Sequence, residues 1–208
     1  MNQLLKDTGE RVIPEKMDVT DYMLIEHLAR YHFANLYVKG RVLDLACGSG
    51  YGTHIIAKRC RNQINEVIGI DNSREALDYA RYSYYHPKSI FIEEDVVSDN
   101  LPQHLGQFDS IVSFETLEHI KEEEQFLKNI YDMLKPGGSL ILSTPFGQGR
   151  GKPCGNPFHI HQLTKKQFKA LFTRYESANY YYQAGALIVP EEFAKDTNFP
   201  IGIVVCQK

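Results

Sequence analysis

Two carboxylates and an imidazole lie close together in the sequence, at Glu115, Glu118 and His119, and His159 and His161 supply two more imidazoles. Because residues three and four apart share one face of a helix, a helical turn at 115–119 would direct the first three side chains to one place. His119 with Glu115 could then remove the proton of an acceptor hydroxyl by general-base catalysis. Alternatively, Glu115, Glu118, His119 and His159 could bind a divalent cation, or these residues could simply line a pocket and shape the loop over it. Mixed oxygen and nitrogen ligands would favour magnesium, manganese or cobalt over structural zinc.

A glycine-rich turn, Ala46-Cys47-Gly48-Ser49-Gly50, is the second feature with a chemical meaning. It lies directly between a short apolar run and a helix-like segment. Glycines at such a bend let the backbone turn sharply and let a ligand approach where a Cβ atom would collide. Dinucleotide-binding folds use a similar turn to hold pyrophosphate at a helix N-terminus. The turn alone therefore predicts a nucleotide-like ligand without identifying it.

Three aspartates near the ends of apolar runs narrow the choice of ligand. Asp44 precedes the glycine turn, Asp71 follows it by about twenty residues, and Asp95 comes after the third run. A carboxylate at Asp44 would repel a pyrophosphate, whereas it would attract the ammonium and sulfonium groups of S-adenosylmethionine. Asp71 is placed to accept hydrogen bonds from ribose hydroxyls. Each aspartate could also be a simple capping or turn residue, but together the three predict a cationic nucleoside.

Short apolar runs alternate along the chain with helix-like segments, and these elements must position the residues named above. We expect buried strands at 41–46, 66–71, 89–93, 108–114 and 139–143, and strands at 180–183 and 203–206 to complete the sheet. We expect helices at 19–37, 51–59, 73–84, 121–134 and 165–172, with Ser73 and Thr164 as N-caps. This alternation predicts an α/β fold with a doubly wound, mostly parallel seven-stranded sheet covered by helices on both faces. Its ligand crevice would lie at the carboxyl ends of the strands.

Length and the absence of linkers predict a single domain over residues 1–208. Within it we expect an N-terminal helical cap at 1–39, a cofactor-binding core at 40–145, and an acceptor-side loop with C-terminal strands at 146–208. The glycine-rich loop at 145–157 could act as a lid over the acceptor or could be an ordinary surface loop.

Composition excludes several classes of protein. With 43% hydrophobic and 24% charged residues, the chain falls among globular rather than disordered or membrane-spanning proteins. A formal net charge of -3 argues against an obligate nucleic-acid partner, since nucleic-acid-binding domains usually carry a basic excess. Cys47, Cys60, Cys154 and Cys206 show no zinc or disulfide spacing. The sequence shows neither a signal-peptide pattern nor a membrane span, so we expect a cytoplasmic protein. We expect it to be a monomer or a homodimer.

The segment 42–52, with Asp71, Asp95 and the segment 108–119, resembles the class I S-adenosylmethionine-dependent methyltransferases over residues 40–145. The resemblance implies that the turn at 46–50 wraps the methionine part of the cofactor, that Asp71 binds the ribose, and that Asp95 and Val96 flank the adenine. It also implies an antiparallel last strand. The cofactor-binding residues expected on this basis are Asp44, Ala46, Cys47, Gly48, Ser49, Gly50, Asp71, Asn72, Asp95, Val96 and Phe114.

The expected activity is methyl transfer from S-adenosylmethionine to an oxygen, or less favourably a nitrogen, of a small metabolite or sugar, with S-adenosylhomocysteine as product. The stretches 9–15 and 27–31 resemble a bacterial subgroup that modifies glycans or small metabolites. The candidate metal ligands resemble those of metal-dependent 2′-O-methyltransferases that act on small-RNA 3′ ends and, in part, magnesium-dependent ubiquinone-biosynthesis O-methyltransferases. Metal-assisted methylation of RNA ends is therefore an alternative, as is a non-catalytic cofactor-binding module. A nicotinamide-dependent oxidoreductase is disfavoured by Asp44.

Overall fold

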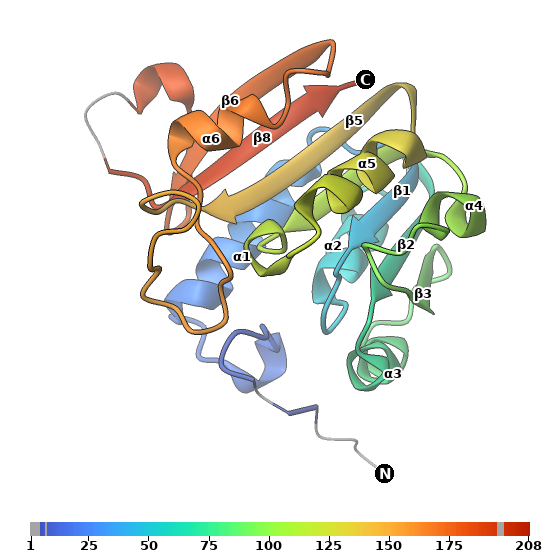
Figure 1. Cartoon of the computed structure of the whole chain (residues 1–208). Helices are drawn as coiled ribbons and strands as arrows, with labels where there is room; N and C mark the ends of the chain where they lie inside the picture. Colours follow the sequence, from blue (N-terminus) through green and yellow to red (C-terminus); the bar gives the residue numbers. More distant parts are fainter. Residues whose placement is uncertain (1–4, 7, 195–197) are drawn as a thin grey trace.

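The computed structural model describes residues 5–6, 8–194 and 198–208, and its centre is one eight-stranded sheet. The strand order is β3-β2-β1-β4-β5-β8-β6-β7 (Figure 1). The five parallel strands are β1 (Gly40–Leu45), β2 (Ile64–Asp71), β3 (Ser89–Glu93), β4 (Phe108–Phe114) and β5 (Leu134–Pro145). β8 (Ile201–Gln207) pairs antiparallel with β5, and β6 (Ser177–Ala184) and β7 (Leu187–Pro190) complete the edge. The predicted mostly parallel sheet with an antiparallel last strand is confirmed.

The sheet has one strand more than predicted. β7 pairs with β6 through a tight hairpin in which Ala184 faces Leu187, and Gly185 has a φ of 58°. A positive φ at the turn suits the right-handed twist of a hairpin, and glycine adopts it without strain. β7 is only four residues long and ends at a proline, and none of its residues is buried. Its three apolar residues, Leu187 to Val189, are too short a run to predict a strand on their own.

Helices cover both faces of the sheet. Their bounds are α1 (Tyr22–Ala34), α2 (Tyr51–Arg59), α3 (Arg74–Ser83), α4 (Leu101–Leu105), α5 (Glu123–Met133) and α6 (Lys165–Ala170). Short 3-10 turns add η1 (Pro14–Lys16), η2 (Leu117–His119) and η3 (Glu191–Phe193). Ser73 accepts a hydrogen bond from the backbone of Ala76, and Thr164 forms a capping box with Gln167, so both predicted N-caps are confirmed. Among the described residues, none of the helices has the length and apolar character needed to span a bilayer.

Two separate hydrophobic clusters lie on the two faces of the sheet. On one face, Ala34 of α1, Ile56 of α2 and Leu77 of α3 pack together with Val42 of β1. On the other, residues of α4, α5 and α6 pack with Leu43 and Leu45 of β1, as the helices in front of the sheet in Figure 1 show. Side chains alternate between the faces of a strand, so Asp44 must share the face of Val42 and point toward α1 and α2.

The carboxyl ends of three neighbouring strands meet at one edge of the sheet. In the parallel register, Leu45 at the end of β1 lies opposite both Ile70 of β2 and Ser113 of β4. The residues that come directly after these three paired positions are therefore brought together: the glycine turn, Asp71 with Asn72, and Phe114 with Glu115. This edge is where the sequence predicted a ligand crevice.

Candidate active site

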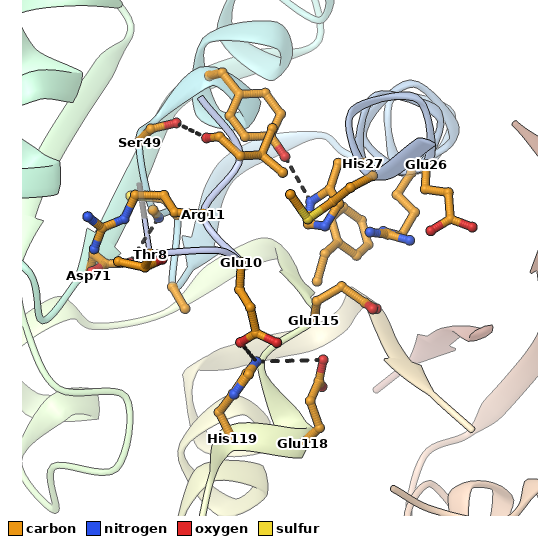
Figure 2. A pocket seen from close by; sticks show the side chains of 18 of the residues that line it. Thr8, Glu10, Arg11, Glu26, His27, Ser49, Asp71, Glu115, Glu118 and His119 are labelled. Carbon is orange, nitrogen blue, oxygen red and sulfur yellow. Dashed lines mark hydrogen bonds and ion pairs between the residues drawn. The ribbon is translucent and has the colours of Figure 1, made fainter. Parts of the chain in front are cut away.

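A cavity of about 550 Å³ opens at these strand ends. Its walls come from the segment 8–12, from α1, from the turns after β1, β2 and β4, and from the loop after β5 (Figure 2). The residues that line it are Thr8, Glu10, Arg11, Val12, Met23, Glu26, His27, Arg30, Tyr31, Ala46, Cys47, Gly48, Ser49, Tyr51, Asp71, Asn72, Phe114, Glu115, Glu118, His119, Asn156 and His159.

The glycine turn forms one wall of the cavity through its backbone. Ala46, Gly48 and Gly50 all have positive φ, at 56°, 56° and 84°. A Cβ atom on Gly50 would lie 2.5 Å from the Cβ of Ala80, so a side chain there would collide with α3. A Cβ on Gly48 would meet nothing within 4 Å, so the backbone at Gly48 faces open space. The turn thus leaves room for a ligand at its centre.

Asp71 lies across from this turn and is fixed by the backbone. Its Oδ2 accepts a hydrogen bond from the Gly48 N–H at 2.9 Å, and its Oδ1 accepts one from the Ser73 N–H at 2.9 Å. Each carboxylate oxygen has further lone pairs, so Asp71 can still accept hydrogen bonds from a diol. Its position on the cavity wall is compatible with the ribose-binding role expected for it.

A second cavity of about 240 Å³ adjoins the first on the side of β3 and shares five lining residues with it, Ala46, Asp71, Asn72, Glu115 and His119. Val96 and Glu94 line this second cavity. Asp95 does not: its side chain is exposed, and its Oδ1 accepts a hydrogen bond from the Val97 N–H at 3.0 Å. The expected flanking of an adenine ring is thus available from Val96 and Glu94, while Asp95 shapes the turn.

Asp44 differs most from expectation, because its carboxylate points away from the cavity. It is fully buried on the α1/α2 face, where it accepts hydrogen bonds from the Thr53 hydroxyl at 2.6 Å and the Tyr31 hydroxyl at 3.1 Å. Tyr31, in contrast, lines the cavity. The structure therefore does not place Asp44 on the cavity wall, as the sequence suggested, and its hydrogen-bond partner Tyr31 lies there instead. Burial raises the pKa of Asp44 to about 7, against partial lowering by these hydrogen bonds.

This raised pKa gives a testable dependence of stability on pH. The folded state holds the Asp44 proton more tightly than the unfolded chain, so this group's stabilising contribution is lost as the pH rises from about 4 to about 7. Asp44→Asn should remove that component, which amounts to at most about 1.4 kcal/mol per pH unit. Urea unfolding at several pH values measures it. Parallel pH profiles for the wild type and the variant would contradict the prediction.

Glu115 and Glu118 do not share a helical face as the spacing suggested. Only Leu117–His119 forms a 3-10 turn, and Glu115 precedes it with a φ of 49°. The Ser143 hydroxyl donates to Glu115 Oε1 at 2.7 Å, and the Thr144 hydroxyl donates to Glu118 Oε2 at 3.0 Å. Burial, and then the charge of Glu115, hold the pKa of Glu118 well above its usual range. Both carboxyl groups nevertheless line the cavity.

His119 presents one defined nitrogen to the cavity. Its Nδ1 lies 3.0 Å from the carbonyl oxygen of Phe158, which can only accept, so Nδ1 carries the proton. In a neutral ring, Nε2 then keeps its lone pair. Nε2 lies 3.8 Å from Glu10 Oε2 and 3.9 Å from Glu118 Oε1, too far for hydrogen bonds (Figure 2). His119 is therefore oriented as a base with two carboxylates beside it.

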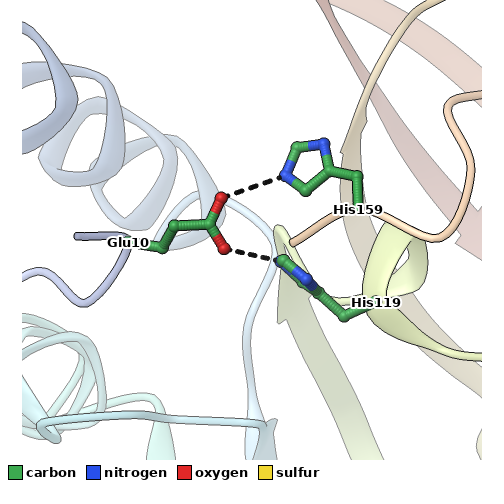
Figure 3. Close-up of side chains that lie close together, drawn as sticks. All are labelled: Glu10, His119 and His159. Atoms are coloured by element: carbon green, nitrogen blue, oxygen red, sulfur yellow. Dashed lines mark ion pairs between the residues drawn. The ribbon is translucent and has the colours of Figure 1, made fainter. Parts of the chain in front are cut away.

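Glu10 and His159 complete a cluster with His119 that the sequence did not predict as a set. One ligand atom from each of the three lies within 4.8 Å of the others, and Figure 3 shows the Glu10 carboxylate between the two rings. His159 Nε2 lies 3.4 Å from Glu10 Oε1. Burial, and then the proximity of His119, lower the pKa of His159, which favours its neutral form. His161, the other nearby imidazole, is 3.4 Å from Glu123 and does not line this cavity.

Residues 8–12, which we call the N-terminal strap, are held against the cavity at three points. The Asn156 amide donates to Glu10 Oε1 at 2.5 Å, the Arg11 guanidinium donates to the Ser73 hydroxyl at 3.3 Å, and the Ser49 hydroxyl donates to the Val12 carbonyl at 2.7 Å. The loop after β5 thus reaches the site through Asn156 and His159. Its role as a lid stays a prediction.

Most of the predicted cofactor residues line the two cavities, and the exceptions are Asp44, Gly50 and Asp95. The lining residues that sequence reasoning missed come mostly from the strap and from α1. Five of them with polar side chains are Glu10, Arg11, His27, Arg30 and Tyr31. All five fall within the stretches 9–15 and 27–31, which suggested only a subgroup and gave no individual roles.

Comparison with known proteins adds an independent line of evidence. Residues 42–138 match a family described as "Methyltransferase domain". A "Probable S-adenosylmethionine-dependent methyltransferase" of Mycolicibacterium smegmatis is 33% identical over 169 residues, covering 79% of this chain and 62% of that protein. A "Ubiquinone biosynthesis O-methyltransferase" of Thiobacillus denitrificans is 34% identical over 105 residues, 50% of this chain and 44% of that protein. The chain thus spans about three-fifths of the length of the first of these relatives.

A solved structure extends the comparison to the fold. The crystal structure of the small RNA methyltransferase HEN1 superposes with a TM-score of 0.71 at 17% sequence identity, covering 94% of this chain and 27% of that one. At this identity the match shows a shared fold, without extending to substrate.

Proposed function

Because this chain belongs to the class I S-adenosylmethionine-dependent methyltransferase superfamily, we propose that it transfers a methyl group from S-adenosylmethionine to an oxygen of a small metabolite or sugar. The observation that carries the proposal is the place of His119, whose ring is oriented by the contact of Nδ1 with the Phe158 carbonyl, at the wall of the same cavity that contains the glycine turn and Asp71. A hydroxyl is a poor nucleophile until its proton is removed, and His119 supplies a base for that step.

The cavity wall suits the parts of the donor. The open backbone at Gly48 suits the methionine part, Asp71 the ribose, and Val96 in the adjoining cavity the adenine. A donor placed in this way would run across the ends of β1 and β2. Its sulfonium would then lie on the side of Phe114 and Glu115, at the carboxyl end of β4.

The proposed reaction is an in-line displacement at carbon. The acceptor oxygen forms a bond to the methyl carbon while the bond from that carbon to sulfur breaks, and both electrons of the broken bond stay on sulfur. The acceptor proton passes to Nε2 of His119, and S-adenosylhomocysteine is released. Positioning and exclusion of water supply much of the acceleration because the donor is already activated. Glu10 beside Nε2 would stabilise the imidazolium that forms.

The charges beside His119 support a neutral acceptor with hydroxyl groups. Glu10 and Glu115 line the cavity, and their negative charges disfavour phosphate-rich or polyanionic acceptors. Carboxylates are also common hydrogen-bond acceptors for polyols. The name of the Thiobacillus relative gives O-methylation as a precedent within this superfamily.

We expect S-adenosylhomocysteine to raise the melting temperature of the purified protein, because a ligand that binds only the native state stabilises it. At 100 times its dissociation constant, the gain is about 2.7 kcal/mol. NAD serves as the matched control and should give no shift. Release of S-adenosylhomocysteine on addition of a panel of sugars and phenols then tests turnover. Stabilisation by NAD alone would overturn the proposal.

A second candidate is metal-assisted transfer, and the convergence of Glu10, His119 and His159 favours it. Two imidazoles and a carboxylate form a donor set suited to manganese, cobalt or iron(II). Of the ligands predicted from sequence, His119 and His159 belong to this set. Glu118 and Glu115 do not: Glu118 Oε1 lies 3.9 Å from His119 Nε2, and Glu115 accepts a hydrogen bond from the Ser143 hydroxyl. The donor set fits a cation, with Glu10 in the place expected for Glu115. A bound cation would lower the pKa of the acceptor hydroxyl.

The two candidates make opposite predictions for metal binding, since His119 Nε2 cannot hold a metal and accept a proton together. If the cluster binds metal, Co²⁺ should give visible absorption bands on titration, and Glu10→Gln should weaken Co²⁺ binding at least about tenfold, the scale typical of altered metal shells. Glu115→Gln is the control and should change this affinity little. Full activity in EDTA with no Co²⁺ spectrum would leave His119 acting as a base alone.

A further inference from the structure

His27 of α1 places on the cavity wall an imidazole that the proposed reaction does not use. It shares one face of the helix with Met23 and Glu26, which also line the cavity, because residues three and four apart on a helix lie together. Its Nδ1 lies 3.0 Å from the hydroxyl oxygen of Tyr51, the first residue of α2. Its second ring nitrogen, Nε2, has no hydrogen-bond partner in the part of the chain that the structure describes. Nε2 is thus the polar atom of this side chain that is left for a ligand.

The Tyr51 hydroxyl determines which nitrogen of His27 carries the proton. Tyr51 is 7% exposed, and burial raises the pKa of its hydroxyl, so the hydroxyl keeps its proton. Among the described residues that hydroxyl has no acceptor other than His27 Nδ1, and a buried donor without an acceptor is costly. The Tyr51 O–H therefore donates to Nδ1. Burial, and then the charge of Arg30, hold the pKa of His27 well below its usual range, so the ring is neutral and its proton is on Nε2.

Packing and hydrogen bonds hold this pair in one arrangement. The ring of Tyr51 lies edge-on against that of Tyr31 with centroids 5.4 Å apart, and the Tyr31 hydroxyl donates to Asp44 of β1. On the other side of α1, Glu26 accepts a hydrogen bond from the Gly185 N–H at 3.0 Å, which attaches the helix to the β6–β7 hairpin. The direction of the Nε2–H bond of His27 is therefore set before any ligand binds, which lowers the entropic cost of binding.

His27 and His119 present opposite hydrogen-bonding characters to the same cavity. His119 Nδ1 donates to a carbonyl oxygen, which leaves Nε2 as an acceptor, whereas His27 Nδ1 accepts from a hydroxyl, which makes Nε2 a donor. Figure 2 shows Glu115 between the two histidines. The electrostatics agree, because behind burial, the largest effect, the charge of Glu115 acts to raise the pKa of both Glu26 of α1 and His159 of the loop after β5. An acceptor that reaches His119 therefore has His27 on its other side.

We propose that His27 donates a hydrogen bond to a second oxygen of the methyl acceptor, an inference that rests on the proposed function. The attacking hydroxyl gives its proton to His119, while a neighbouring hydroxyl, ether or carbonyl oxygen receives the Nε2–H of His27. An alkylammonium group has no lone pair and cannot take this position. An acceptor without the second oxygen would leave a partly buried N–H unpaired. The inferred substrate class is a neutral polyol or an oxygen-substituted phenol.

The test compares two phenols of equal size, 2-methoxyphenol, which has a second oxygen, and 2-ethylphenol, which has a methylene group in its place. Methyl α-glucoside and its monodeoxy forms are the corresponding sugars. The wild type should favour the oxygen-bearing member in kcat/KM by about 5- to 100-fold, the effect of leaving a buried donor unpaired. His27→Leu should reduce this preference to about one by raising the KM of the oxygen-bearing compound. His27→Gln should keep part of the preference, because its amide can still donate.

Tyr51 acts through His27 as a positioning residue and has its own test. Tyr51→Phe keeps the ring against Tyr31 but removes the hydroxyl, so either nitrogen of His27 can then carry the proton. The preference for the second oxygen should fall in part. Nitrogen-15 NMR of the His27 ring should show mixed tautomers in this variant and the proton on Nε2 in the wild type. Tyr51→Phe carries the test if His27→Leu does not fold.

His32→Leu is the matched control, because His32 is an exposed imidazole of the same helix that does not line the cavity. It should leave the preference unchanged. Equal weakening of both phenols by His27→Leu would overturn the proposal and indicate a packing role. Weaker S-adenosylhomocysteine binding with an unchanged preference would also overturn it, because His27 would then contact the methyl donor.

Two further outcomes separate this inference from the proposed function. If S-adenosylhomocysteine binds the wild type but none of the phenols or sugars is methylated, the inferred acceptor class is wrong. If S-adenosylhomocysteine does not bind the wild type, the proposed function itself fails.

Discussion

Replacing His119 by glutamine should lower kcat about 10²- to 10⁴-fold, the usual contribution of a positioned general base. The glutamine amide can still donate to the Phe158 carbonyl, as Nδ1 does at 3.0 Å, so the 3-10 turn should keep its shape. No side-chain nitrogen with a free lone pair remains, however. Single-turnover measurements with excess enzyme isolate this step from product release. Binding of S-adenosylhomocysteine should stay within a few-fold of wild type, because only the proton transfer is removed.

His161→Gln is the control for this substitution. His161 is an imidazole two residues from His159, but it faces Glu123 and lies outside the cavity. Its replacement should leave kcat within about twofold, as expected for a residue away from the reacting groups. Wild-type kcat in His119→Gln would remove His119 from the mechanism.

The largest effect on stability is expected from Gly52→Ala. A Cβ atom on Gly52 would lie 1.9 Å from Cζ of Tyr31, so α1 and α2 cannot keep their spacing. Displacing Tyr31 also removes a hydrogen bond from the fully buried Asp44 carboxyl. Overpacking and an unsatisfied buried acceptor each cost about 1–3 kcal/mol, so a combined loss of about 3 kcal/mol is expected. Urea unfolding followed by circular dichroism measures the change.

Two variants separate the causes of that loss. Tyr31→Phe keeps the ring and removes only the hydroxyl, so it should lose about 1–2 kcal/mol through Asp44 alone. Gly155→Ala adds the same methyl group where a Cβ would meet nothing within 4 Å, and it should be nearly neutral. A Gly52→Ala protein as stable as Gly155→Ala would show that the helices separate at little cost.

The sequence predicted those parts of the site that are determined locally. The glycine turn follows β1 and Asp71 ends β2, and both strands could be found from their apolar runs. Parallel strands bring their carboxyl ends together in any fold of this class. Asp44 was assigned a direct ligand contact because its place in the chain was clear but its direction was not. Which face of β1 it shares becomes evident only once α1 and α2 are packed against Val42.

The residues that were missed depend on contacts between distant parts of the chain. Glu10 meets Asn156 across 146 residues, and Arg30 meets Gln183 across 153. No spacing rule connects such positions, and an isolated glutamate or arginine on a helix is usually solvated. The helical-face argument for Glu115 and Glu118 failed for a related reason. The directions of those two side chains are determined by hydrogen bonds from Ser143 and Thr144 of β5 rather than by their three-residue spacing.

The N-terminal strap has a consequence for turnover. We expect donor and product to occupy the cavity between the N-terminal strap and the strand ends of the sheet. The strap is held over the cavity by single hydrogen bonds that involve Asn156, Arg11 and Ser49. Exchange of product for a new donor molecule would then depend on how often the strap detaches. Purification tags or fusions placed ahead of Thr8 would then change how fast donor and product exchange. The residence time of the bound ligand would change, while the single-turnover rate would stay constant.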